Sequence, residues 1–236
     1  IWSLEELTSI DVPAIKISSC NLTNIPFLQK VVSKKLPVLL STGMSNIEEV
    51  TEAVSILKNG KIPFMIFQCT SNYPSKAENA NLNVLKTYKK ILNIEIGLSD
   101  HTSSNVTSIA AIAMGAIAIE KHFTLSKKLP GIDQMASLEP EEFKSLVNDV
   151  NTCKLALGSF FKFKTEEEND TSLALRRSLV AATNLKAGET ITENNLLIMR
   201  PGSGLKPNYL TKILGKKLTK DVKKGTPINL DHFLLS

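Results

Sequence analysis

The sequence predicts an α/β protein: a (β/α)8 TIM barrel that lacks its N-terminal part, followed by a small β-rich domain. Short apolar runs that end in polar residues recur through the first 160 residues, with helical segments between them. The intervals between run ends are 23, 29, 29 and 22 residues, counted at Ser18, Ser41, Thr70, Ser99 and Lys121. This is the length of a βα unit. No Gly-x-Gly-x-x-Gly loop follows a run, so a barrel is favoured over a dinucleotide-binding sheet.

The strands are expected at residues 14–17, 37–40, 64–67, 94–98 and 116–119, and the helices at 47–57, 83–91, 103–114 and 139–157. The first helix has the clearest signals, because Ser45 and Glu48 have capping-box spacing and Gly60 follows its end. In the last helix Pro140 lies in the first turn and Gly158 follows the end.

Three segments are expected along the chain. Residues 1–160 form the barrel domain, 161–171 a charged linker, and 172–236 a second domain with short strands and tight turns. Five strands cannot close an eight-stranded barrel, and the chain starts at Ile1 rather than at Met. We therefore expect the missing units to precede residue 1, so that the chain as given lacks part of its active site.

Composition and sequence patterns exclude several classes of protein. A net charge of +5 with dispersed lysines and 6% aromatic residues is no nucleic-acid signature. No apolar run reaches the ~18 residues of a membrane span, and no signal peptide is visible. Three cysteines without metal-ligand spacing indicate reduced thiols in a cytoplasmic protein. The isolated His232 is expected at the surface.

Two histidines follow neighbouring predicted strands. The ends of adjacent parallel strands lie ~4.8 Å apart, so His101 and His122 are expected to converge on one small object. An acid lies close to each, Asp100 and Glu120. A lone histidine is usually structural, but this pair favours a site. Lys16 interrupts an apolar strand, and because a buried lysine is costly without a partner, a functional role is favoured.

Ordered motifs from about residue 12 to the C-terminus resemble the N-acetylneuraminate (sialic acid) synthase family. In the first domain they are Ile15-Lys16-Ile17-Ser18-Ser19, Ser41-Thr42-Gly43-Met44, Cys69-Thr70-Ser71-Asn72-Tyr73-Pro74, Gly97-Leu98-Ser99-Asp100-His101-Thr102, Glu120-Lys121-His122-Phe123-Thr124 and Ala136-Ser137-Leu138-Glu139-Pro140. In the second domain Arg177-Ser178-Leu179-Val180-Ala181 and Arg200-Pro201-Gly202 resemble the family's antifreeze-like (SAF) domain. The resemblance implies barrel strands four to eight plus the SAF domain.

The resemblance implies a transferase that condenses phosphoenolpyruvate with N-acetylmannosamine or a related N-acylated sugar. The products are an N-acetylneuraminate-type nonulosonic acid and phosphate. An N,N'-diacetyllegionaminate or other nonulosonate synthase is the alternative within this chemistry. A non-catalytic carbohydrate-binding protein is the alternative of another class. The family also implies a domain-swapped homodimer.

Site roles follow from the same resemblance. His101 and His122 are the implied ligands of a divalent metal, with Mn2+ expected and Mg2+, Co2+ or Zn2+ compatible. Glu120, His122 and Lys16 are the implied catalytic residues. The implied substrate-binding residues are Lys16, Ser19, Ser71, Asn72, Tyr73, Ser99, Asp133 and the SAF residue Arg200, which reaches the partner subunit's barrel. Gln134 stands where the family usually carries His.

Overall fold

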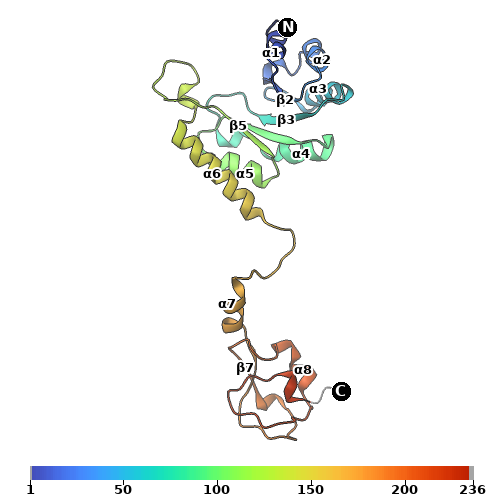
Figure 1. Ribbon diagram of the computed structural model, residues 1–236, viewed down its shortest axis with the longest axis vertical. Coiled ribbons are helices and arrows are strands. Elements are labelled where there is room, and N and C mark those ends of the chain that lie inside the picture. Colours follow the sequence, from blue (N-terminus) through green and yellow to red (C-terminus); the bar gives the residue numbers. More distant parts are fainter. Residues whose placement is uncertain (1, 234–236) are drawn as a thin grey trace. The chain divides into compact units, whose positions relative to one another are not determined.

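Five parallel strands form the sheet of the first part of the chain, in the order in which they occur in the sequence. They are β1 (Ile15–Ile17), β2 (Val38–Ser41), β3 (Phe64–Cys69), β4 (Ile96–Asp100) and β5 (Ala118–Lys121). The structure, a computed structural model, describes residues 2–233 (Figure 1). A sequential parallel order is that of a barrel wall, whereas a doubly wound sheet reverses its order at a switch point.

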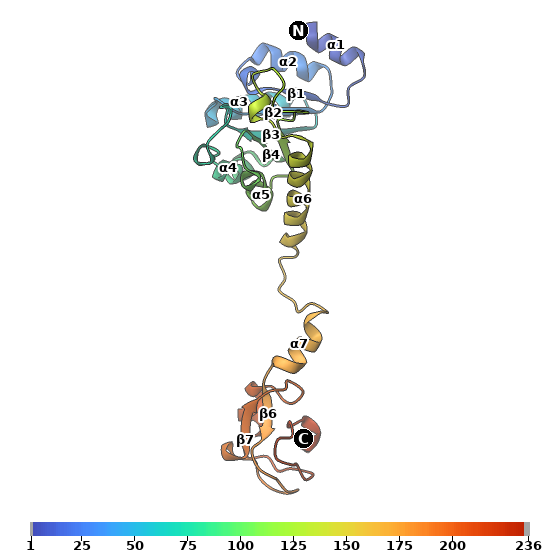
Figure 2. The same cartoon turned by 90° about the vertical axis from the view of Figure 1, so that its left-hand side faces the viewer.

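The helices that connect the strands cover one face of the sheet. They are α2 (Ile25–Ser33), α3 (Ile47–Asn59), α4 (Asn83–Leu92) and α5 (Asn105–Ala113), while α1 (Trp2–Ser9) precedes β1 and α6 (Pro140–Leu157) follows β5. Figure 2 shows α2, α3, α4 and α5 following one another along the sheet. The hydrophobic core lies between these layers, where strand residues such as Leu40 and Ile66 meet helix residues such as Leu57 and Leu85, all fully buried.

The other face of the sheet is polar at the carboxyl ends of the strands. Successive side chains in a strand point to opposite faces. The core takes Ile15 and Ile17, so Lys16 between them lies on the opposite face. Ser99 pairs with Glu120 across β4 and β5, and Cys69 pairs with Ser99 across β3 and β4. This pairing places polar side chains of three strands in one row.

The predicted helices are present, with shifts of a few residues at their ends. The capping box of α3 is formed by Asn46 and Glu49 rather than by Ser45 and Glu48, because Asn46 accepts from the Glu49 backbone at 2.9 Å and Glu49 accepts in return at 2.8 Å. Gly60 ends α3, as predicted. Strands β4 and β5 start and end about two residues later than expected.

Two compact units divide the chain, Ile1–Gly158 and Ser159–Ser236. The second contains α7 (Glu168–Leu175), an antiparallel pair β6 (Ser178–Ala181) and β7 (Leu196–Met199), and α8 (Leu210–Ile213). Its core includes Leu179, Leu185 and Ile228. Helix α7 begins inside the segment expected to be a linker, and its side chains are mostly exposed, so no apolar stripe signalled it.

The expectation of a surface position for His232 is wrong. This residue is buried, and its Nδ1 accepts a hydrogen bond from the Asn229 backbone at 3.0 Å. The side chain closes a local turn and is therefore drawn into the unit. All three cysteines are free thiols. Within residues 2–233 no helix combines the length and apolarity needed to cross a membrane.

Candidate active site

The two histidines lie together at the ends of β4 and β5, as the strand order predicts. The ring centroids of His101 and His122 are 5.2 Å apart, with an interplanar angle of 76°. The Tyr73 ring lies 4.2 Å from the His101 ring and 5.3 Å from the His122 ring. Three rings from separate segments therefore form one cluster above the polar face of the sheet.

Hydrogen bonds orient the His101 ring. Nδ1 lies 2.8 Å from the Thr70 carbonyl oxygen, which assigns the N–H to Nδ1 and leaves the lone pair on Nε2. Burial opposes protonation of this ring, but its contacts with Cys69 and with the Thr70 carbonyl outweigh burial and raise the pKa of His101. Burial likewise favours the neutral thiol of Cys69, yet His101 and Ser19 together lower the pKa of Cys69.

The two imidazoles fit a shared divalent cation. An N–H donated to a backbone carbonyl is the usual arrangement of a metal-bound histidine, and His101 has it. At a nitrogen–metal distance of ~2.1 Å each ring centroid would lie roughly 3 Å from the ion, which accords with the observed spacing. Residues 2–233 contain no group of three or more His, Cys, Asp or Glu side chains able to hold a metal. Water and substrate would therefore have to complete the coordination.

An acid, a lysine and two serines form a second cluster on the same face. Glu120 Oε1 accepts a 2.8 Å hydrogen bond from Ser99, and Oε2 lies 3.2 Å from Lys16 Nζ. Lys16 also donates to Ser41 Oγ at 2.8 Å. Its side chain remains 32% exposed, so the lysine can reach a bound anion. Ser41 was not predicted as a site residue; its position at a strand end was the available signal.

A close approach at Gly43 brings two predicted serines together. The Gly43 backbone N–H donates to Ser19 Oγ at 2.9 Å. A Cβ on Gly43 would lie 2.2 Å from Ser71 Oγ, 2.9 Å from Ser19 Oγ and 3.2 Å from Cys69 Sγ. Only glycine leaves these side chains in place, so Ser19 and Ser71 flank one small space beside Cys69.

The remaining predicted residues lie at the rim or in the second unit. Asp133 is exposed, with Oδ2 4.0 Å from His122 Nδ1. Asn72 is exposed on the loop that also carries Tyr73. Arg200 is exposed in the second unit.

Asp100, the acid next to His101 in the sequence, does not lie in the site. Asp100 is the last residue of β4 and follows Ser99, so its side chain points to the face of the sheet opposite Ser99. There it forms a buried ion pair with Lys121, 3.0 Å long. Glu120 is thus the only one of the two predicted acids that shares a face with the histidines.

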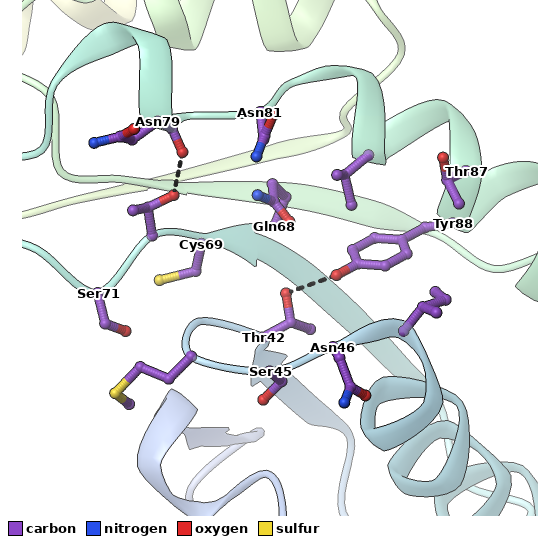
Figure 3. Close-up of a pocket in the computed structure, with 14 residues that line it drawn as sticks. Thr42, Ser45, Asn46, Gln68, Cys69, Ser71, Asn79, Asn81, Thr87 and Tyr88 are labelled. Carbon is purple, nitrogen blue, oxygen red and sulfur yellow. Dashed lines mark hydrogen bonds between the residues drawn. The ribbon is translucent and has the colours of Figure 1, made fainter.

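A cavity of about 710 Å3 adjoins the site at the ends of β2 and β3 (Figure 3). The described side chains that line it are uncharged, with the amides of Asn46, Gln68 and Asn81 among them. Tyr88 donates to Thr42 Oγ1 across it at 3.1 Å. Cys69, Thr70 and Ser71 line both the cavity and the neighbouring site.

Comparison with known proteins agrees with this arrangement. Residues 1–162 match the model of the NeuB family, and residues 176–234 match that of the SAF domain. An uncharacterized protein of Methanocaldococcus jannaschii is 43% identical over 97% of this chain and 68% of that protein. An N,N'-diacetyllegionaminic acid synthase of Legionella pneumophila is 37% identical over 98% of this chain and 66% of that enzyme. A human N-acetylneuraminate-9-phosphate synthase is 34% identical over 96% of this chain and 64% of that enzyme.

Solved structures agree as well. The N-acetylneuraminic acid synthetase of Leptospira borgpetersenii, determined with citrate, superposes with a TM-score of 0.68 and 36% identity, over 72% of this chain and 60% of that chain. A spore coat polysaccharide biosynthesis protein of Bacillus subtilis superposes over 100% of this chain and 71% of that chain, with a TM-score of 0.64 and 29% identity. The chain spans about two thirds of the length of the curated relatives it matches. It belongs to the NeuB family, in which the named relatives are synthases, and its second unit carries a SAF domain.

Proposed function

We propose that the protein carrying this chain condenses phosphoenolpyruvate with N-acetylmannosamine or a related N-acylated sugar. One water molecule is consumed, and the products are an N-acetylneuraminate-type nonulosonic acid and inorganic phosphate. The observation that carries the proposal is the convergence of Lys16, Glu120 and two imidazoles on one polar face of the sheet. Family membership supports an enzyme rather than a carbohydrate-binding protein, because the named relatives are synthases.

The phosphoenolpyruvate anion suits the serine and lysine groups. Lys16 supplies a positive charge, and the hydroxyls of Ser19, Ser71 and Ser99 supply directional donors. Lys16 now divides its contacts between Ser41 and Glu120. An anion bound to Lys16 competes with Glu120 for the ammonium group, so donor binding loosens that ion pair.

Glu120 suits the stabilisation of positive charge. Condensation at the alkene carbon of phosphoenolpyruvate develops oxocarbenium-like charge on the neighbouring carbon, and a fixed carboxylate stabilises it. Ser99 holds Oε1 of Glu120 at 2.8 Å and so fixes the direction of the carboxylate. His101 and His122 would hold a divalent cation, for which we propose Mn2+, with Mg2+, Co2+ or Zn2+ as alternatives; the ion would polarise the sugar aldehyde.

The acceptor sugar is proposed to lie against Tyr73 and Asp133, with Asn72 beside the donor. A second candidate acceptor is the diacetamido sugar that leads to N,N'-diacetyllegionaminate. Synthases of that name from two bacteria are 37% identical to the chain, against 34–35% for the N-acetylneuraminate-9-phosphate synthases. Because this difference in identity is small, both acceptor sugars are included in the test below.

The proposed function also requires a complete barrel and a second subunit. We propose that β1–β5 are strands four to eight of a (β/α)8 barrel, supported by their sequential parallel order. We propose a domain-swapped cytoplasmic homodimer in which Arg200 reaches the partner subunit's site. The exposure of Arg200 on the SAF unit supports this arrangement.

An assay of the natural-length protein tests the proposed function directly. Phosphate release is measured from phosphoenolpyruvate with Mn2+ and either N-acetylmannosamine or the diacetamido sugar. We expect sugar-dependent release that a chelator stops and added Mn2+ restores. Release without any sugar, or no release with either acceptor, would refute the proposed reaction. The acceptor with the higher kcat/KM decides between the two candidates.

A further inference from the structure

A buried ion pair lies beside the two histidines, on the opposite face of the sheet. Asp100 Oδ2 and Lys121 Nζ are 3.0 Å apart, and each side chain is only 1% exposed. The two residues pair across β4 and β5. Asp100 immediately precedes His101 and Lys121 immediately precedes His122, so the pair joins the two strand ends that carry the imidazoles.

The backbone that follows His101 is held by the same ion pair. Asp100 Oδ1 accepts from the Thr102 backbone N–H at 2.8 Å, and Lys121 Nζ donates to the Thr102 carbonyl. Asp100 Oδ2 also accepts from Ser108 of α5 at 2.6 Å. The pair therefore ties β4, β5 and the start of α5 together, and it fixes the residues on both sides of His101.

Stability alone does not account for this arrangement. Moving two charges out of water costs several kcal/mol per ion, and well-packed apolar replacements are often as stable or more stable. The pair also faces away from the polar face, so Asp100 and Lys121 contact no bound substrate. The ion pair instead restricts the local conformation, because hydrogen-bonded charges are stable in far fewer side-chain arrangements than apolar side chains are.

We propose that the Asp100–Lys121 ion pair is a positioning device that fixes the spacing of His101 and His122 for a shared divalent cation. The inference rests on the proposed function only in that the two imidazoles bind one cation. Partners of this kind around metal-binding histidines typically change metal affinity by about 10–100-fold when they are removed.

The test uses the double variant Asp100→Asn, Lys121→Met in the natural-length protein. It removes both charges while keeping similar side-chain volumes, so no unpaired charge is left buried, and Tm is measured to check that the variant folds. The dissociation constant for Mn2+ is measured from the electron paramagnetic resonance signal of the free ion, with His122→Gln as the reference that lacks the site. We expect Mn2+ binding to weaken by about 10–100-fold, with the KM for phosphoenolpyruvate less affected.

Lys127→Met is the matched control. It breaks a 2.6 Å ion pair with Glu142 that is partly exposed in the same unit, and Mn2+ affinity should not change. Ser108→Ala is the milder variant, in case the double variant does not fold. It removes one hydrogen bond to Asp100 and should weaken Mn2+ binding several-fold.

Unchanged Mn2+ affinity in the folded double variant, or in Ser108→Ala, would overturn the inference. So would a wild-type protein that binds no Mn2+. A wild-type protein that binds Mn2+ through the histidines but condenses no phosphoenolpyruvate would refute only the proposed function.

Discussion

The replacement of Gly43 by alanine tests the donor pocket through a single methyl group. The added Cβ would lie 2.2 Å from Ser71 Oγ and 2.9 Å from Ser19 Oγ, so both hydroxyls must move. Ser71 is partly exposed and can rotate away, whereas Ser19 also accepts from the Gly43 backbone at 2.9 Å and is displaced from a fixed position.

The expected effect is on donor binding rather than on folding. A hydrogen bond to a charged group contributes about 1.5–3 kcal/mol. Losing one such bond to the phosphate raises the KM for phosphoenolpyruvate by roughly tenfold to a hundredfold. The stability change is small, because alanine at a position without positive φ stabilises by about 0.4–1 kcal/mol through the unfolded chain, which offsets part of the crowding.

Steady-state phosphate release at varied phosphoenolpyruvate concentration measures this effect. Ser71→Ala and the double variant Gly43→Ala, Ser71→Ala are the controls. Because the Cβ of Gly43→Ala still lies 2.9 Å from Ser19 Oγ when the Ser71 hydroxyl is absent, the double variant should have a higher KM for phosphoenolpyruvate than Ser71→Ala alone. A KM for phosphoenolpyruvate that stays at the wild-type value in Gly43→Ala, with sugar saturating, would refute the placement of the phosphate between Ser19 and Ser71.

Three further outcomes are expected. Glu120→Gln keeps an acceptor for Ser99 but loses the charge, so kcat should fall about a hundredfold. Tm should hardly change, because a partly exposed ion pair such as Glu120–Lys16 contributes about 0–1 kcal/mol to stability. A kcat near the wild-type value would exclude a catalytic role for the carboxylate. His122→Gln should abolish metal-dependent turnover and leave the circular dichroism spectrum intact, since the side chain is 31% exposed; unchanged turnover would remove it from the site. Burial lowers the pKa of His232, so the unfolded chain binds a proton first as the pH falls, and the second unit should lose stability below about pH 6.5. Thermal unfolding at several pH values should show this loss in wild type and a smaller one in His232→Gln; equal slopes would contradict it.

Sequence periodicity was enough to predict the sheet and the meeting of the histidines. Parallel strands in consecutive βα units end on the same side, so His101 and His122 had to be neighbours once β4 and β5 paired. The side on which Asp100 lies could not be predicted, because the predicted strand ended at residue 98. Beyond a strand end, the alternation of side chains no longer indicates a direction.

Contacts between segments that are far apart in the chain could not be predicted from the sequence. Ser41 meets Lys16 only through the pairing of β2 with β1, which no local pattern specifies. The cavity in Figure 3 depends on how two loops pack at the ends of β2 and β3. His232 was misplaced because it accepts a hydrogen bond from the Asn229 backbone three residues earlier, and the pattern of polar and apolar residues does not specify such a turn contact.

The proposed reaction depends on two imidazoles that hold one cation beside a phosphate pocket. A crystal structure of the natural-length protein with Mn2+ and phosphoenolpyruvate would locate the cation through the anomalous scattering of manganese. We expect one anomalous peak within bonding distance of both His101 and His122, with the phosphate against Lys16 and Ser19. A manganese peak that contacts neither ring would refute a shared cation at the two histidines.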